Sequence, residues 1–315
     1  MDITIVIPVY NRKEYIQKTL TSIPEAYPVI LVDNGSTDGS RELCTALAKI
    51  RPNTQVTQEL TPGAASARNK GLSLCQSTWI YFFDSDDLFT GLPTTWNENS
   101  DLICFPTHQQ LGQKIRERSF SPVATPHTHI LNSMLNTQGM IFRTSFLRDI
   151  GGWNPQCFIW DDWELGLRAL LHAPKVQWIT DKTYHVILVH PDSLTGANFA
   201  SRIDRILQAL DIAFNDIYDL APQDEQAFAA LFYRCYILCG KMRHEGHPDA
   251  ATQMRTFIYD HFRAGRQSHQ MGHLFEWGAA KGIRGVWRIA LWLVNHSAKQ
   301  ASSKKLFGGF DVKHS

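Results

Sequence analysis

Three carboxylates follow directly after an apolar segment in the first third of the chain. Residues 79–83 are all hydrophobic, and Asp84, Ser85, Asp86 and Asp87 come next. The apolar run lacks the alternation of a half-exposed strand, so it predicts a strand buried on both faces. Ionised carboxylates are costly to bury, which predicts that they lie at the strand end and face a cleft. Hard oxygen ligands in an Asp-x-Asp pattern suit Mg²⁺ or Mn²⁺ better than zinc.

The same acidic segment also has a simpler interpretation. Asp and Ser are common turn formers, so these residues would suit a solvated acidic turn as well. Carboxylates packed closely raise one another's pKa unless a cation joins them. The choice between a metal site and a turn therefore depends on what else the fold brings to this strand end.

Strands and helices alternate along the first half of the chain. The alternation predicts βαβ units and a mostly parallel, doubly wound sheet flanked by helices. The expected strands are 3–7, 29–32, 54–59, 79–83, 102–105, 139–143, 176–179 and 184–189. Helices are expected at 13–22, 64–74 and 144–150. A further helix is expected to run from Ser36 or Asp38 as its N-cap to Lys49, and another to start near Asp161. Apart from the strand at 102–105, residues 88–135 are expected to be irregular.

Ligands of such sheets bind beyond the carboxyl ends of the strands. Three of the expected strands end in polar segments, at Pro8–Tyr10, Asp33–Gly35 and Asp84–Asp87. We expect these segments to meet at one edge of the sheet. No GxGxxG follows the first strand, so the dinucleotide-binding fingerprint is missing.

Composition excludes several classes of protein. The 315 residues are 43% hydrophobic and 19% charged, as in ordinary globular chains, and the net charge of +1 offers no argument for nucleic-acid binding. The six cysteines form no CxxC pair, and Cys235 and Cys239 are interpreted as two buried thiols on a helix. No basic leader segment is visible and no apolar run reaches about 18 residues. These features predict a cytoplasmic protein.

The pattern after about residue 198 is helical, which predicts a catalytic domain at 1–197 and a helical region at 198–315. Helices are expected at 200–219, 223–244, 248–263 and 283–296. The last one carries Trp287 and Trp292 between basic residues. It could rest on the inner face of a membrane or pack inside the helical region. Both alternatives stay open.

Six segments resemble the motifs of family 2 glycosyltransferases, which have the GT-A fold. They cover roughly residues 1–195 and are Ile5–Arg12, Val32–Asp38, Ala67–Gly71, Phe83–Asp87, Gly151–Asn154 with Trp160–Glu164, and the segment around His190. Two positions depart from the usual pattern. Asn34 replaces an Asp, which should matter little if Asp33 is the residue that contacts the base, and Asp161 replaces a Glu, which leaves the neighbouring Asp162 in place. The Gln-x-x-Arg-Trp motif of processive synthases is absent, which indicates a non-processive enzyme.

The resemblance implies how a nucleotide-sugar donor would be bound. Asp86 would hold Mn²⁺ or Mg²⁺ with His190 as a further contact, and Asp84 with Ser85 would complete the clamp on the diphosphate. Pro8 belongs to the nucleotide-binding turn. Three further residues would contact the nucleotide: Tyr10 by stacking on the base, Asp33 by accepting the imide N–H of uracil, and Arg68 by offering a cation.

The resemblance also implies the reaction. Inverting transfer needs a base for the acceptor hydroxyl, and Asp162 is expected in that role, with the neighbouring Asp161 as the alternative. Glu164 and Arg168 are expected to form an ion pair on a helix surface. The expected product is a sugar moved from a UDP-sugar to a glycan or lipid-linked acceptor in surface polysaccharide synthesis. The donor sugar and the oligomeric state stay open.

Three rival functions fit parts of the pattern. A glycoside hydrolase would pair one carboxylate near 84–87 with another near 161–164. A degenerate, non-catalytic protein would bind the sugar nucleotide without transferring it, although the retention of Asp86 and Asp162 argues against this. A nucleotidyltransferase would usually carry a Gly-rich basic loop after its first strand, and Pro8–Asn11 is not one.

Overall fold

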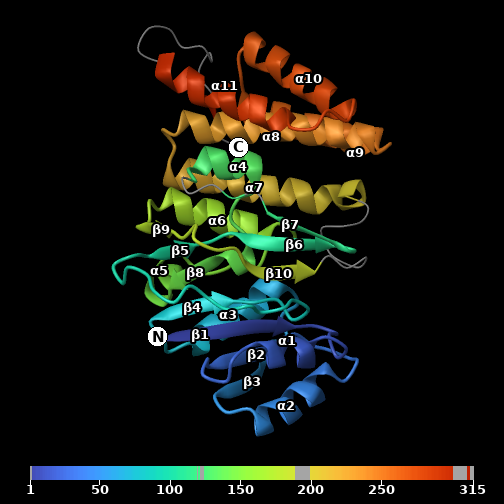
Figure 1. The fold of residues 1–315 in the computed structure, drawn as a ribbon. Helices are drawn as coiled ribbons and strands as arrows, with labels where there is room; N and C mark the ends of the chain where they lie inside the picture. The colour runs from blue at the N-terminus through green and yellow to red at the C-terminus, as the bar shows by residue number, and fades with distance from the viewer. Residues whose placement is uncertain (1, 119, 121–123, 189–198, 301–310, 313–315) are drawn as a thin grey trace. The chain divides into compact units, whose positions relative to one another are not determined.

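The chain divides into two compact units. The computed structural model describes residues 2–118, 120, 124–188, 199–300 and 311–312. Unit 1 comprises residues 1–123 and 134–193, and unit 2 comprises residues 124–133 and 194–315. Unit 2 therefore takes a short segment from within the first half of the chain (Figure 1). The division into functional domains at residue 197 stays a prediction.

Unit 1 is built on a seven-stranded sheet in which all strands but one run in the same direction. Only β8 is antiparallel to its neighbours, so the predicted mostly parallel sheet is confirmed. The spatial order of the strands is β3 (Thr54–Gln58), β2 (Val29–Asp33), β1 (Ile3–Val9), β4 (Trp79–Phe82), β8 (Met140–Arg143), β5 (Leu102–Cys104) and β9 (Val176–Trp178). Val9, Asp33 and Gln58 lie in register, so these strands end along one edge.

Among its described residues, unit 1 also contains five helices, one short 3₁₀ turn and a small second sheet. The helices are α1 (Ile16–Ser22), α2 (Ser40–Ile50), α3 (Ala64–Leu74), α5 (Thr144–Asp149) and α6 (Asp161–Leu171); the turn is η1 (Thr137–Gly139), and the sheet has the order β10 (Tyr184–Leu188), β6 (Thr107–Leu111) and β7 (Lys114–Glu117). Helix α3 has the predicted bounds. It approaches β1 so closely that a Cβ on Gly71 would lie 2.2 Å from Cγ1 of Val6.

The expectation of irregular structure over 88–135 is wrong for β6, β7 and α4 (Pro126–Asn132). All four residues of β7 are exposed, so the strand that pairs with β6 has no buried face and shows no apolar periodicity in the sequence. Helix α4 does carry a signal, because Thr125 caps it and Pro126 occupies its first turn. The expected N-cap of α2 also shifts: Gly39 holds that position in a left-handed conformation, and Asp38 accepts from the backbone of Ser40 at 2.9 Å.

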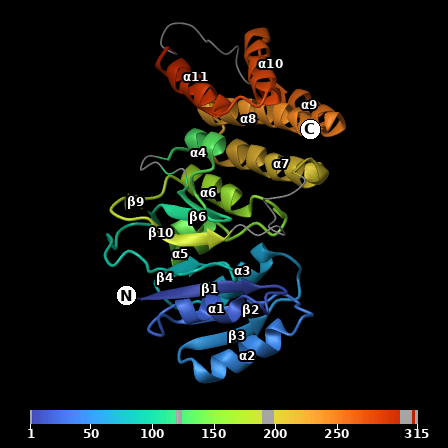
Figure 2. The same cartoon turned by 45° about the vertical axis from the view of Figure 1, so that its right-hand side comes forward.

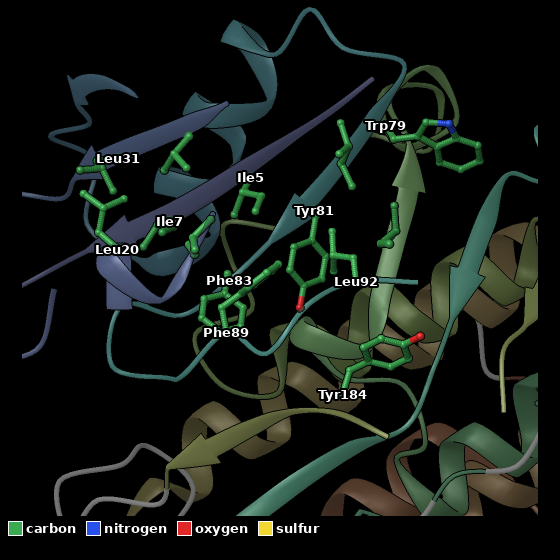
Figure 3. Close-up of a cluster of buried hydrophobic side chains, with 14 of the residues drawn as sticks. Ile5, Ile7, Leu20, Leu31, Trp79, Tyr81, Phe83, Phe89, Leu92 and Tyr184 are labelled. Carbon is green, nitrogen blue, oxygen red and sulfur yellow. The ribbon is translucent and has the colours of Figure 1, made fainter. Parts of the chain in front are cut away.

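The core of unit 1 includes a cluster of buried hydrophobic side chains from β4 and its neighbouring strands. Figure 3 shows side chains of β1, β2 and β4 in this cluster, with Phe83 and Phe89 side by side. The ring centres of Phe83 and Phe89 are 5.7 Å apart. His185 lies within the same cluster, fully buried, and its Nδ1 accepts from the backbone N–H of Thr90 at 3.3 Å. Burial lowers the pKa of His185 to about 3, so this imidazole is neutral. The acidic segment that follows β4 thus lies directly after a buried, apolar part of the chain.

Unit 2 is a set of helices packed around α8 (Glu225–His244). Figures 1 and 2 show α8 beside α9 and α10, and helices α4, α7 and α11 also contact it. The other elements are η2 (Phe199–Arg202), α7 (Ile203–Leu220), α9 (Pro248–His261), β11 (Phe262–Arg263), α10 (Arg266–Ala280), α11 (Val286–Gln300) and β12 (Asp311–Val312). The predicted helical region is confirmed, and α10 adds a helix that was not among the expected ones.

Cys235 and Cys239 are buried free thiols on α8, as predicted. Among the described helices, none combines the length and the hydropathy that crossing a bilayer requires.

Candidate active site

The turns that follow β1 and β2 hold each other by hydrogen bonds. The backbone N–H of Asn11 donates to Oγ of Ser36 at 3.1 Å, and the backbone N–H of Thr37 donates to Oδ1 of Asn11 at 2.8 Å. Pro8 is half-buried and lies opposite Val32 in the sheet register, whereas 58% of Tyr10 is exposed. The side chain of Tyr10 is therefore largely exposed at this edge of the sheet.

Asp33 ends β2 and is buried, with 1% of its surface exposed. Its Oδ1 accepts from the backbone N–H of Ser36 at 3.2 Å, and its Oδ2 accepts from Nε2 of Gln58 at 3.3 Å. Both contacts are long for N–H···O hydrogen bonds. The carboxylate is thus oriented by the turn that follows β2 and by the end of β3.

Asn34 has a role that the resemblance to the family did not suggest. Its Nδ2 donates to the carbonyl oxygens of Glu59 at 2.9 Å and Thr61 at 2.8 Å, and its Oδ1 accepts from the N–H of Gly63 at 2.8 Å. An Asp at this position has no N–H to donate to two carbonyls. Asn34 therefore connects the end of β2 to the segment that leads into α3, and its amide is not equivalent to the usual carboxylate.

Arg68 connects two groups of carboxylates. Its Nη2 donates to Oδ1 of Asp84 at 2.8 Å and its Nη1 donates to Oδ2 of Asp161 at 2.6 Å, while its guanidinium lies 4.3 Å from the ring centre of Trp153. Arg68 is 5% exposed. Burial acts to lower its pKa, but Asp161 and Asp84 more than offset this and raise the pKa above its usual value. Arg68 is therefore a buried bridge between the end of β4 and the start of α6.

Gln138 is a site residue that sequence reasoning missed. This buried side chain comes just before β8, and its Nε2 donates to Oδ2 of Asp84 at 2.6 Å and to Oδ2 of Asp87 at 2.5 Å. The hydroxyl of Tyr81 donates to the backbone carbonyl of Gln138 at 2.8 Å, which fixes the segment. Only the pairing of β4 with β8, far apart in sequence, brings this amide to the carboxylates.

Replacing Gln138 by Met is expected to destabilise unit 1 by about 2–4 kcal/mol. Met has a similar volume but no donor, so two carboxylates each lose a charge-assisted hydrogen bond. Urea unfolding at pH 7.5 measures the effect, with Gln156→Met as the matched control because Gln156 is exposed. An unchanged unfolding free energy in Gln138→Met would show that the amide does not hold these carboxylates.

Asp86 lies beside a cation, and Ser85 is buried. Nε of Arg12 donates to Oδ2 of Asp86 at 3.2 Å, and the backbone carbonyl of Ser85 accepts from Oγ1 of Thr19 at 2.9 Å. Asp84 already contacts Arg68 and Gln138 through its two oxygens. Thus the residues of the Asp-Ser-Asp segment have distinct surroundings: Asp84 is oriented by two donors, Ser85 anchors the backbone to α1, and Asp86 pairs with Arg12.

The carboxylates of the Asp-Ser-Asp segment suit a divalent cation that also binds phosphate. In the described ranges there is no group of three or more His, Cys, Asp or Glu side chains placed to hold a metal ion. Mg²⁺ and related hard cations commonly take one or two protein carboxylates and complete their coordination with phosphate oxygens and waters. Asp86 fits that requirement. His190, the other predicted metal contact, lies outside the described residues.

The two adjacent carboxylates of α6 differ in their surroundings. Asp161 is engaged through both oxygens, since Oδ1 accepts from the N–H of Asp162 at 3.1 Å and Oδ2 binds Arg68. Oδ1 of Asp162 accepts from the N–H of Trp163 at 2.8 Å. Oδ2 of Asp162 has no hydrogen-bond or ion-pair partner within the part of the chain that the structure describes.

Asp162 is also the carboxylate whose acidity is changed most clearly. Burial raises its pKa to about 6 and the neighbouring Asp161 adds to the rise, while Arg118 and Arg68 oppose it. A carboxyl with this pKa is ionised above pH 6 and accepts a proton more readily than an ordinary Asp.

The predicted ion pair between Glu164 and Arg168 is confirmed, but its predicted location on the helix surface is wrong. Glu164 is fully buried, and Arg168 binds it through Nε at 2.6 Å and Nη2 at 3.2 Å. The guanidinium also donates to the carbonyls of Ile150 and, at 2.7 Å, Gly152. The pair therefore fastens the Gly-Gly turn to α6. The sequence did not predict this burial, because helix spacing alone does not show which face of α6 the turn covers.

Asn69 holds the residue after that turn. Its Nδ2 donates to the carbonyl of Trp153 at 2.7 Å, and its Oδ1 accepts from the N–H of Trp153 at 2.9 Å. Gly152 has a φ of +71°, and a Cβ there would lie 2.6 Å from Oδ1 of Asn69. Consecutive residues of α3 thus position both the carboxylate bridge and the loop before α6.

Known proteins resemble part of the chain in sequence. Residues 4–93 match the family model for glycosyl transferase family 2. The minor teichoic acid biosynthesis protein GgaA of Bacillus subtilis (strain 168) is 34% identical over 97 residues, which are 28% of this chain and 22% of GgaA. Three further bacterial relatives share 35–38% identity, and the matched segments span 13–36% of their lengths.

Solved structures share the fold over nearly the whole chain. A crystal structure of S. aureus TarS 1–349 with UDP-GlcNAc has a TM-score of 0.64 at 17% identity and covers 100% of this chain and 99% of that one. The mannosyltransferase PcManGT of Pyrobaculum calidifontis, in complex with GDP-Man and Mn²⁺, has a TM-score of 0.53 at 17% identity, covering 97% and 87%. The fold is that of the GT-A glycosyltransferases. The match to glycosyl transferase family 2 covers residues 4–93, which are less than a third of the chain.

Proposed function

We propose that the protein is a metal-dependent, inverting, non-processive glycosyltransferase that uses a nucleotide-diphosphate sugar. The observation that carries the proposal is the bridge through Arg68, which links Asp84 on the donor side to Asp161 at the start of α6. The bridge connects the acidic segment after β4 with the start of α6. Asp86, which suits a metal–diphosphate complex, and Asp162, which suits proton transfer, each follow closely in the chain a carboxylate that Arg68 binds. The domain boundary at residue 197 and the site residues belong to the same proposal.

On the donor side, Asp86 would hold Mn²⁺ or Mg²⁺, assisted by His190. The cation would neutralise the charge that develops on the leaving diphosphate. Arg12, now paired with Asp86, adds a second positive charge at the same place. Asp84 is oriented by Arg68 and Gln138, which suits it to the ribose hydroxyls or to supporting the metal ligand.

On the nucleotide side, Tyr10 would stack on the base above the half-buried Pro8. Asp33 would exchange its long contact with Gln58 for the imide N–H of uracil. Uracil is supported by TarS, whose structure contains UDP-GlcNAc, and a divalent cation is supported by PcManGT, whose complex contains Mn²⁺.

On the acceptor side, Asp162 would take the proton of the attacking hydroxyl. The hydroxyl oxygen bonds to the anomeric carbon, the proton passes to Oδ2 of Asp162, and the nucleoside diphosphate departs with the electrons of the broken C–O bond. Asp161 is the weaker candidate because both of its oxygens are already engaged. The acceptor would be a glycan or lipid-linked saccharide of the cell surface, which the similarity to GgaA supports.

Release of a nucleoside diphosphate from a panel of nucleotide-sugars tests the proposal. Purified protein with Mn²⁺ is expected to release UDP from at least one UDP-sugar, and to stop when EDTA is added. A degenerate binding protein would bind a donor and release nothing. Sugar release from a glycan without nucleotide or metal would favour the glycoside hydrolase instead.

A further inference from the structure

Large apolar side chains are exposed on the last two helices of unit 2 and the turn between them. Trp277 is 58% exposed, Ile283 50%, Ile289 59% and Trp292 57%. Leu274, one turn before Trp277 on α10, is also exposed. Apolar side chains exposed singly are ordinary, but several along one short stretch indicate an interaction surface.

The packing of α11 separates this surface from the core. Val286, Ala290 and Val294 follow one another at intervals of four residues and are buried. Ile289 and Trp292 lie on a different face, and Arg288 is exposed beside them. Helix α11 packs on the rest of unit 2 through the face that carries Val286, Ala290 and Val294. The exposed apolar residues are therefore not needed for this packing.

The charges on the same segment are of one sign. Residues 277–300 contain four Lys or Arg and no Asp or Glu. Lys281 and Arg284 are exposed in the turn and Arg288 follows on α11. We call these three cations, together with Trp277, Ile283, Ile289 and Trp292, the α10–α11 patch.

We propose that the α10–α11 patch docks on the surface of an anionic lipid bilayer. Cations would meet the lipid phosphates, and the aromatic and branched side chains would enter the headgroup region, where Trp is favoured. The uniform positive charge distinguishes this surface from a protein interface, whose centre is usually depleted of charge. Among the described helices none can span the bilayer, so the contact would be peripheral. The inference does not depend on the proposed transfer activity.

Co-sedimentation of the full chain with vesicles tests the charged part of the patch. The protein is expected to bind vesicles that contain phosphatidylglycerol and not vesicles of phosphatidylcholine alone, with weaker binding at 0.5 M salt. A triple variant, Lys281→Gln, Arg284→Gln and Arg288→Gln, should lose about a hundredfold in partition coefficient, at on the order of fivefold per cation. The control neutralises three exposed cations of unit 1, at Lys18, Arg41 and Lys49, and should stay within about twofold.

The apolar part has its own variants. Trp277→Ser with Trp292→Ser should weaken binding about tenfold or more, while Ile50→Ser with Ile115→Ser, which are exposed in unit 1, should not. Circular dichroism confirms that each variant keeps its helices. Equal binding of wild type and both patch variants overturns the inference, as does self-association through the patch without vesicle binding. Release of UDP from a soluble donor is expected to be unchanged, which separates this inference from the proposed function.

Discussion

Replacing Asp162 by Asn is expected to lower kcat by about 10²–10⁴-fold while leaving donor affinity within about twofold. Asn keeps the hydrogen bond to the N–H of Trp163 but cannot take a proton through its second side-chain atom. Steady-state assays of nucleoside diphosphate release give kcat, and calorimetric titration with the same nucleotide gives affinity. If the Asp162→Asn variant stays active, a residue other than Asp162 is the catalytic base.

The stability of the same variant separates catalysis from folding. The pKa of Asp162 is raised in the folded state, so its contribution to stability is present below about pH 4 and is lost as the pH rises through about 6. Asp162→Asn should therefore unfold at equal or higher urea concentration than wild type at pH 7.5, with no such gain near pH 4. In wild type, kcat/KM should fall as the pH drops below about 6.

Asp161→Asn is the matched comparison, because it changes the neighbouring carboxylate. Asp161 pairs with the buried guanidinium of Arg68, so its neutralisation should cost about 1–3 kcal/mol of unfolding free energy. A loss of kcat as large as that of Asp162→Asn, with stability unchanged, would identify Asp161 as the base.

Replacing Asp86 by Ala is expected to lower donor affinity in Mn²⁺ by about a hundredfold or more. In EDTA the two proteins should bind the nucleotide equally, because the lost interaction runs through the cation. Glu98→Ala, an exposed position in unit 1, serves as the control. Calorimetric titrations with and without Mn²⁺ measure both conditions. Equal affinity of Asp86→Ala and wild type in Mn²⁺ would remove Asp86 from the metal site.

Most of the sheet could be predicted because its signals are local. Continuous apolar runs of four or five residues marked β2, β4 and β5, and polar residues after the strands marked the edge at which Asp33 and Asp84 lie. The weak point was the stretch 88–135. Strand β7 is entirely exposed, so nothing in its composition distinguishes it from a loop.

The sequence by itself determined which residues follow the strands and which motifs they form. Only the tertiary structure decided how those residues act on one another. Gln138 reaches Asp84 and Asp87 because β8 pairs antiparallel with β4, and Arg68 reaches Asp161 across 93 positions of the chain. Hydrogen bonds are directional and short, so which oxygens remain available depends on the packing of distant segments. That packing distinguishes Asp162 from Asp161, two neighbours that sequence alone could not orient.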